Sequence, residues 1–257
     1  MTERRARGGR PARGEPVLDR AFRLLGCFSP DRPTLSLAAL SELAGLPKPT
    51  ALRLARKLVE LGALEQAESG DYTIGLRLLE IASLAPRGHG LRENALPYME
   101  DLLHATGQHV LLSVREGVAA VLVERLSARG AHRVGYRVGG RMPLHSTGNG
   151  LVLLAFAPKR VQEEVLAVDW SADEENLNGT GAELRARLAA VRRNRFAVSS
   201  RRKRGVSLTS VAAPVVDRRK NTIAAVSVIT GSEQVAPATH IPAVVAVARA
   251  ISRAAAL

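Results

Sequence analysis

GLPKPTALRLARKLVELGALEQ, residues 45–66, carries a short helix with two contrasting faces. Proline is tolerated in the first turn of a helix, so the helix is expected to begin at Pro47 or Pro49, although Pro49 disfavours helical angles at Lys48. Gly62 is expected to end it. One face holds Leu54, Leu58 and Leu61, and the other holds Arg53, Arg56, Lys57 and Glu60. The stretch is therefore either an amphipathic helix with a solvated basic face or a helix that reads DNA.

The segments on either side of this helix predict three further elements. An apolar stripe at helical spacing predicts a helix over residues 16–28: Val17, Ala21, Leu24, Leu25 and Phe28. Ser36 predicts the N-cap of a second, short helix that ends at Gly45. Alternating residues around a Ser69-Gly70 turn predict a β-hairpin. Three helices followed by a hairpin make a winged helix-turn-helix, which we place at residues 16–75.

This order of elements favours a DNA-reading role for the third helix. In a winged helix-turn-helix the third helix lies in the major groove with its N-terminal residues at base edges. Thr50, Arg53 and Lys57 project from the side opposite the leucines, and arginine and lysine reach guanine acceptors or phosphates. A solvated basic face remains the alternative for the helix taken alone.

The formal net charge of +13 lies elsewhere in the chain. Residues 1–15 carry +3, residues 16–85 and 86–191 are each neutral, and residues 192–257 carry +10. The DNA argument must therefore rest on local placement and not on global charge. The arginine arm, Arg4 to Arg13, is expected to be disordered when free and to reach a minor groove.

Composition indicates a globular protein with no metal or other cofactor. The single cysteine, Cys27, excludes a disulfide framework, and the six histidines form no ligand-spaced pair with a carboxylate or cysteine. The arginine-rich N-terminus has no apolar core behind it, and no run of about 18 apolar residues follows. We therefore expect a cytoplasmic protein.

The rest of the chain predicts a linker and a second domain. Residues 76–85 form an apolar helix, PRGHG at residues 86–90 suits a break, and residues 91–107 form another helix. We assign residues 76–90 to a linker helix and hinge and residues 91–257 to the second domain. HVLLSV and VAAVLVER predict one hairpin, and SVAAPVV and TIAAVSVIT predict a second around the turn DRRKN.

MPLHSTGNGLVLLAFA, residues 142–157, is the most informative stretch of that domain. Gly148, Asn149 and Gly150 open an apolar helix whose free backbone amides would suit a carboxylate or phosphate. The alternative is a tight loop that glycine merely permits. Ser210, Ser227 and Thr230 are small hydroxyls in apolar strands, where a hydroxyl normally satisfies neighbouring backbone.

His145 and Ser146 raise an acyl-transfer alternative. No G-x-S-x-G elbow surrounds Ser146, and spacing pairs it with no catalytic Asp or His elsewhere. We therefore expect no enzymatic activity and no catalytic residues.

Five stretches together resemble the IclR family of bacterial transcriptional regulators. They run from Val17 to the C-terminus: VLDRAFRLLGCF, LAALSELAGLPKPTALRLARKLVELGALEQ, YTIGLRLLEIASLA, RVGGRMPLHSTGNGLVLLAF and SVAAPVVDRRKNTIAAVSVITG. The resemblance implies an α+β protein with an N-terminal winged helix-turn-helix, a linker helix and a C-terminal GAF-like α/β domain with an antiparallel sheet. It also implies a homodimer or homotetramer on a palindromic double-stranded DNA operator, and no enzyme.

The resemblance and the motif geometry together name candidate site residues. The DNA-binding candidates are Ser36, Lys48, Thr50, Arg53, Lys57 and Tyr72. Thr50 and Arg53 would meet bases or phosphates, Ser36 a phosphate, and Tyr72 the backbone beside the wing. The effector-binding candidates, implied by residue match with the family, are Gly148, Asn149, Ser199, Ser210 and Ser227.

One departure from the family concerns the segment from Arg192 to Arg204. The family usually carries acidic residues after the strand that ends near Ser199, whereas this segment holds seven basic residues and no acidic one. An exposed basic loop is most often solvated. Alternatively, Arg201, Arg202, Lys203 or Arg204 attracts an anionic effector, or the loop adds nonspecific attraction to DNA.

The sequence thus predicts a DNA-binding transcriptional regulator, more often a repressor in such a family, whose operator affinity changes when a small-molecule effector binds the second domain. An organic acid is the effector class we favour. The rival prediction is a small-molecule sensor that acts through protein partners without sequence-specific DNA binding.

Overall fold

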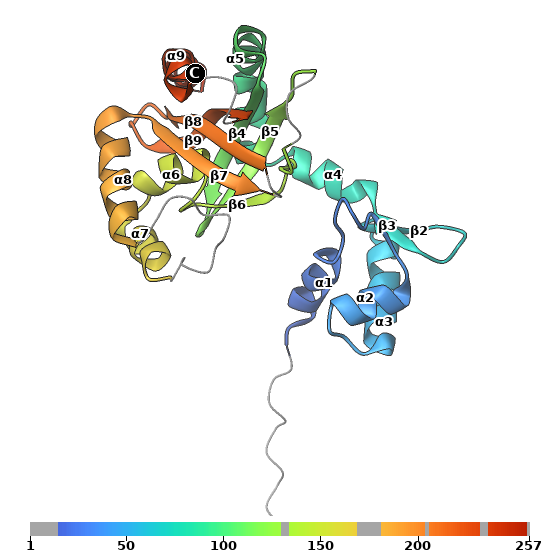
Figure 1. Cartoon of the computed structure of the whole chain (residues 1–257). Coiled ribbons are helices and arrows are strands. Elements are labelled where there is room, and N and C mark those ends of the chain that lie inside the picture. The colour runs from blue at the N-terminus through green and yellow to red at the C-terminus, as the bar shows by residue number, and fades with distance from the viewer. Residues whose placement is uncertain (1–14, 130–133, 169–180, 204–205, 232–235, 256–257) are drawn as a thin grey trace, which may run out of the picture. The chain divides into compact units, whose positions relative to one another are not determined.

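The computed structural model describes residues 15–129, 134–168, 181–203, 206–231 and 236–255. The expected arm from Arg4 to Arg13 lies outside these residues. The chain divides into two compact units, Met1–Leu84 and Ala85–Leu257. Figure 1 shows the elements of each unit.

The first unit is a small helical domain with a three-stranded sheet. Its helices are α1 (Val17–Leu25), α2 (Leu37–Leu43), α3 (Lys48–Glu60) and α4 (Leu76–Ser83). Its strands are β1 (Thr34–Leu35), β2 (Leu64–Gln66) and β3 (Tyr72–Ile74), in the order β1-β3-β2 with antiparallel pairing. Leu24, Leu40 and Leu64 are fully buried and join the helices to the sheet in one core. The predicted hairpin is therefore present, and β1 adds a strand that was not predicted.

Local chemistry explains where α2 and α3 begin. The Ser36 Oγ accepts a hydrogen bond from the Ala39 amide at 3.2 Å, which makes Ser36 the N-cap of α2 as predicted. Gly45 adopts a φ of 59°, and this left-handed residue turns the chain toward α3. Lys48 is the first residue of α3, so the expectation that Pro49 keeps it out of the helix is wrong. A proline only biases the backbone angles of the residue before it away from the helical region, and the first turn of a helix tolerates proline.

Two other predictions need correction. The first helix ends at Leu25, and Val17 of its predicted apolar stripe is 50% exposed while Leu24 is buried. PRGHG is a π-helical turn, Pro86–Gly90, that runs directly into the next helix, so it is not a break. Its proline stands in the first turn, where a missing amide donor costs little.

The second unit is a six-stranded antiparallel sheet covered by helices on both faces. Its strands, in the order β6-β5-β4-β9-β8-β7, are β4 (His109–Glu116), β5 (Ala119–Leu126), β6 (Arg141–Pro143), β7 (Ala197–Lys203), β8 (Val206–Val216) and β9 (Thr222–Gly231). Its helices are α5 (Leu91–Thr106), α6 (Gly148–Ala155), α7 (Lys159–Leu166), α8 (Gly181–Asn194) and α9 (Ile241–Ala254), with a 3-10 turn at Pro237–His240.

The alternation of β8 shows how the two faces differ. Val211, Ala213 and Val215 point to the core shared with α5 and α9. Leu208 and Ala212 point to the other core, shared with α6, α7 and α8. Figure 1 shows α5 and α9 on one side of the sheet and α6 on the other. Because both faces are covered, β8 and β9 are apolar nearly throughout, as the sequence predicted for this hairpin.

Candidate functional site

Helix α6 begins in a tightly packed, wholly buried segment. The Thr147 Oγ1 accepts a hydrogen bond from the Gly150 amide at 3.1 Å and donates one to the Pro143 carbonyl at 2.7 Å. The Gly148 amide donates to the Ser210 Oγ at 3.1 Å. Two of the backbone amides that were expected to be free are therefore taken by hydroxyls, because a buried amide needs a partner.

Close approach, and not loop flexibility, explains the glycines. A Cβ at position 148 would stand 2.3 Å from the Ser210 Oγ, and a Cβ at position 150 would stand 2.4 Å from the Pro143 carbonyl oxygen. Neither of these two described glycines has a positive φ. The missing side chains let α6 pack directly on the strands beneath it.

A cavity lies between the start of α6 and the sheet, and we call it the α6 cavity. All five predicted effector-binding residues line it: Gly148, Asn149, Ser199, Ser210 and Ser227. Its other described lining residues are Leu111, Tyr136, Met142, Ser146, Thr147, Arg201, Leu208 and Ile229. The free volume at its centre is about 20 Å³. That is room for about one water molecule, so the cavity is nearly closed.

The polar groups of the α6 cavity hold one another in place. The Asn149 Nδ2 donates to the Ser113 Oγ at 2.8 Å, and the Ser199 Oγ donates to the Ser146 carbonyl at 3.0 Å. Within the described part of the chain, the buried Asn149 Oδ1 has no hydrogen-bond partner. An unsatisfied buried acceptor is costly and marks a place where a ligand donor would bind well.

Arg201 is the only charged residue among the described lining of the α6 cavity. Its Nη1 donates to the Ser146 Oγ at 2.6 Å. Ser146 is the residue that raised the acyl-transfer alternative, and its hydroxyl therefore accepts a hydrogen bond from a guanidinium. Of the other basic candidates, Arg204 and the side chains of Arg202 and Lys203 lie outside what the structure describes.

Sequence reasoning missed the apolar walls of this cavity. Strand alternation could have found two of them, since Leu208 and Ile229 each lie two residues from a predicted serine. Leu111 pairs directly with Ser227 across β4 and β9, which only the strand order reveals. Tyr136 lies in an irregular segment, where no periodic signal exists.

The predicted DNA-binding residues of the first unit gather on α3. Lys48, Arg53 and Lys57 are exposed, and Thr50 is half-buried. The opposite face of α3 is buried through Leu54 and its neighbours. Lys57 pairs with Glu60 at 2.8 Å, an exposed contact that contributes little to stability and can open.

The remaining two DNA-binding candidates have different outcomes. Ser36 stays accessible, since its oxygen caps α2 and its hydroxyl proton remains available to a phosphate. Tyr72 is only 2% exposed and belongs to the core of the first unit. The expected contact of Tyr72 with the DNA backbone is therefore wrong, because its side chain packs inside the first unit.

Comparison with known proteins identifies the family. The model of the IclR helix-turn-helix domain matches residues 17–68, and the model of the bacterial transcriptional regulator IclR C-terminal domain matches residues 85–255. The chain belongs to the IclR family. The predicted resemblance and the predicted fold class are confirmed.

Relatives agree with this over most of the chain. The glycerol operon regulatory protein of Streptomyces griseus is 32% identical over 251 residues, which cover 94% of this chain and 97% of that protein. The HTH-type transcriptional repressor AllR of Escherichia coli K12 is 30% identical over 162 residues, 60% of this chain and 59% of that protein.

A solved structure resembles the whole chain. It is the crystal structure of an IclR homolog complexed with 4-hydroxybenzoate from Microbacterium hydrocarbonoxydans. It has a TM-score of 0.82 and 30% identity, and it covers 93% of this chain and 99% of that one. This IclR-family chain is thus a transcriptional regulator with a DNA-binding helix-turn-helix domain and an effector-binding C-terminal domain, as predicted. Among the described residues, no helix is both long and apolar enough to cross a membrane.

Proposed function

We propose that the effector is a small organic acid bound in the α6 cavity, and that its carboxylate meets Arg201. The hydrogen bond from Arg201 to the Ser146 hydroxyl carries this proposal. A carboxylate is a stronger acceptor than a neutral hydroxyl, so it would take over the guanidinium donor. The relative whose structure holds 4-hydroxybenzoate, an aromatic carboxylate, supports the same chemical class.

The remaining walls suit the body of such a molecule. Leu111, Met142 and Ile229 offer apolar contact, and the Asn149 Oδ1 offers an acceptor to a ligand hydroxyl. Because the free volume is about 20 Å³, the walls must move apart when the effector enters. A ligand that prefers the open arrangement would shift the population of domain conformations, and by reciprocity the operator affinity.

Calorimetric titration with benzoate and 4-hydroxybenzoate tests the site. Arg201→Gln should weaken carboxylate binding by about tenfold or more and leave binding of uncharged phenol unchanged. Arg160→Gln, on the exposed surface of α7, is the matched control and should bind as the unmodified chain does. Asn149→Trp should fill the cavity and abolish binding. Carboxylate binding that survives both cavity variants would rule out this site.

We infer in the same way that the regulator acts as a homodimer or homotetramer on a palindromic operator. Helices α1 and α4, together with the residue that follows α4, carry large apolar side chains that are more than half exposed: Leu18, Phe22, Leu76, Leu79, Ile81 and Leu84. Apolar residues gathered on an exposed helix favour association. Light scattering after size-exclusion chromatography tests this, and a monomer at micromolar concentration would contradict it.

The DNA contacts follow from the exposed residues of α3 and from the cap of α2. We propose that Thr50 and Arg53 contact bases or phosphates and that Ser36, Lys48 and Lys57 contact phosphates.

Membership of the family supports three further proposals. We propose that the regulator is a repressor, which the name of the relative AllR favours. We also propose that it is cytoplasmic and that it has no enzymatic activity. A mobility-shift assay on the DNA beside its own gene tests operator binding directly.

A further inference from the structure

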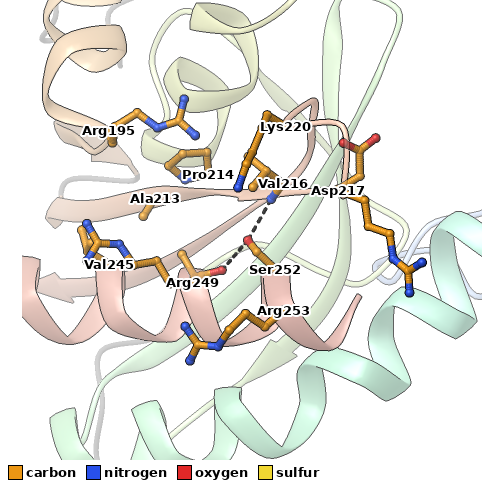
Figure 2. A pocket seen from close by; sticks show the side chains of 12 residues that line it. Arg195, Ala213, Pro214, Val216, Asp217, Lys220, Val245, Arg249, Ser252 and Arg253 are labelled. Carbon is orange, nitrogen blue, oxygen red and sulfur yellow. Dashed lines mark hydrogen bonds between the residues drawn. The ribbon is translucent and has the colours of Figure 1, made fainter. Parts of the chain in front are cut away.

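A second hollow lies further along β8, and we call it the basic hollow (Figure 2). Its lining residues are Arg195, Ala213, Pro214, Val216, Asp217, Arg218, Lys220, Val245, Ala248, Arg249, Ser252 and Arg253. Its free volume is about 430 Å³, within the range of small-molecule sites. Its floor is apolar, and its rim carries five cations and one acid.

The sheet creates this hollow because β8 extends beyond β7. The pairing of the two strands begins at Ala197 and Ala212, so residues 213–216 continue without β7 beside them. Pro214 lacks an amide proton, and the Val216 amide donates to the Ser252 Oγ of α9 at 2.9 Å. The exposed sheet edge is thereby closed to another strand, and the space beside it stays open to a ligand.

Two of the cations stand at unusual backbone positions. Arg195 and Lys220 have φ values of 62° and 65°, and they are the only non-glycine residues with positive φ in the described chain. Glycine would adopt this conformation without strain, yet both positions carry a long cation. Arg195 directly follows α8 and Lys220 lies in the β8–β9 turn, so cations from two different elements line the hollow. The guanidinium of Arg195 lies 4.6 Å from the ring centroid of Phe156, which orients it further.

Few acidic groups neutralise the cations of the basic hollow. Both carboxylate oxygens of Asp217 accept hydrogen bonds from Asn221, at 2.8 Å from its amide and 3.1 Å from its Nδ2. These bonds hold the pKa of Asp217 below its usual value, and they fix its carboxylate within the β8–β9 turn. In the ranges that the structure describes, no carboxylate lies within 4.0 Å of the cationic nitrogens of Arg195, Lys220 or Arg249.

We propose that the basic hollow binds a small organic phosphate, separately from the effector of the α6 cavity. Figure 2 shows Arg195 and Lys220 on the sheet side and Arg249 on α9, with the apolar floor between them. Cations on three elements can meet several oxygens of one multiply charged group, and the floor accepts an apolar or ring-shaped body. A concave site of this size fits a small molecule better than a nucleic-acid duplex. Five of the twelve basic residues between position 192 and the C-terminus line this hollow.

The test uses the full chain and three probes: inorganic pyrophosphate, ADP and adenosine. Calorimetry should give saturable binding of pyrophosphate and ADP at one site per chain and none for adenosine. The variant Arg195→Gly, Lys220→Gly keeps the backbone conformation and removes two cations, so it should fold and bind both phosphates about tenfold more weakly or worse. Arg249→Glu, a single exposed change on α9, should do the same.

Two controls separate binding in the basic hollow from a general charge effect and from binding in the α6 cavity. Arg160→Glu on α7 changes the net charge as much as Arg249→Glu and should alter the affinity by less than about twofold. Arg201→Gln, in the α6 cavity, should leave pyrophosphate binding intact. The proposal is overturned if neither phosphate saturates, if adenosine binds as tightly as ADP, if Arg160→Glu weakens binding as much as Arg249→Glu does, or if Arg201→Gln abolishes binding.

Discussion

The backbone amide of Gly148 donates a hydrogen bond to the Ser210 Oγ at 3.1 Å, which joins the first residue of α6 to the middle of β8. A Cβ at position 148 would stand 2.3 Å from that same oxygen. Gly148→Ala should therefore cost about 1–3 kcal/mol of unfolding free energy through overpacking.

Urea denaturation of Gly148→Ala measures this cost, and a double-mutant cycle supplies the control. In a Ser210→Ala background the clashing oxygen is gone, so the added methyl group should cost less than it does in the unmodified chain. Equal costs in the two backgrounds would show that the contact does not govern the packing of α6.

Arg53→Ala should weaken operator binding by about 1–3 kcal/mol and relax discrimination at the bases it contacts. Lys57→Ala should weaken binding more uniformly across sequences and reduce its salt dependence, since phosphates carry no sequence information. Fluorescence anisotropy with operator and scrambled duplexes at several salt concentrations measures both. If Arg53→Ala leaves affinity and specificity unchanged, α3 is not the reading helix.

Ser36 allows capping and phosphate contact to be separated. Ser36→Ala removes the acceptor for the Ala39 amide and should cost about 1 kcal/mol of stability. Ser36→Asp should retain the cap and the stability, because aspartate is also a good N-cap. It should nevertheless weaken DNA binding, because its charge would repel a nearby phosphate. Unchanged operator affinity in Ser36→Asp would remove Ser36 from the DNA interface.

His240 should make stability depend on pH. It is 7% exposed at the start of α9, and burial lowers its pKa from the usual 6.5. The unfolded chain therefore takes up the proton first as pH falls, so this contribution to stability is complete above pH 6.5 and declines below it. Thermal unfolding at about pH 7.5 and 5.5 should show a smaller loss for His240→Gln than for the unmodified chain. An equal loss in both would assign the effect to other groups.

The sequence predicted the winged domain well, because its signals are local. A cap at Ser36, glycines at Gly45 and Gly62, and alternation in the hairpin each act within a few residues. The predicted DNA contact of Tyr72 was wrong for the opposite reason. Its side chain belongs to one core with Leu24 and Leu40, which lie 48 and 32 positions earlier in the chain, and no local pattern shows such packing.

The α6 cavity shows the same division between local and distant signals. Family resemblance named Gly148, Asn149 and three serines, and the structure brings all five to one cavity, although their effector role stays a prediction. Spacing alone could not bring Ser146 and Arg201 together, since 55 positions separate them. Nor could spacing show that the Ser210 hydroxyl accepts a hydrogen bond from the Gly148 amide, because these residues are 62 positions apart.

The near closure of the α6 cavity has a kinetic consequence. If the effector binds in this cavity as proposed, a free volume of about 20 Å³ is too small for an organic acid, so each binding event would have to follow or drive a rearrangement of the cavity walls. In the first case the observed association rate would rise with effector concentration only until it equals the opening rate, and would then level off. The regulator would then respond to an abrupt rise in effector at a speed set by its own packing.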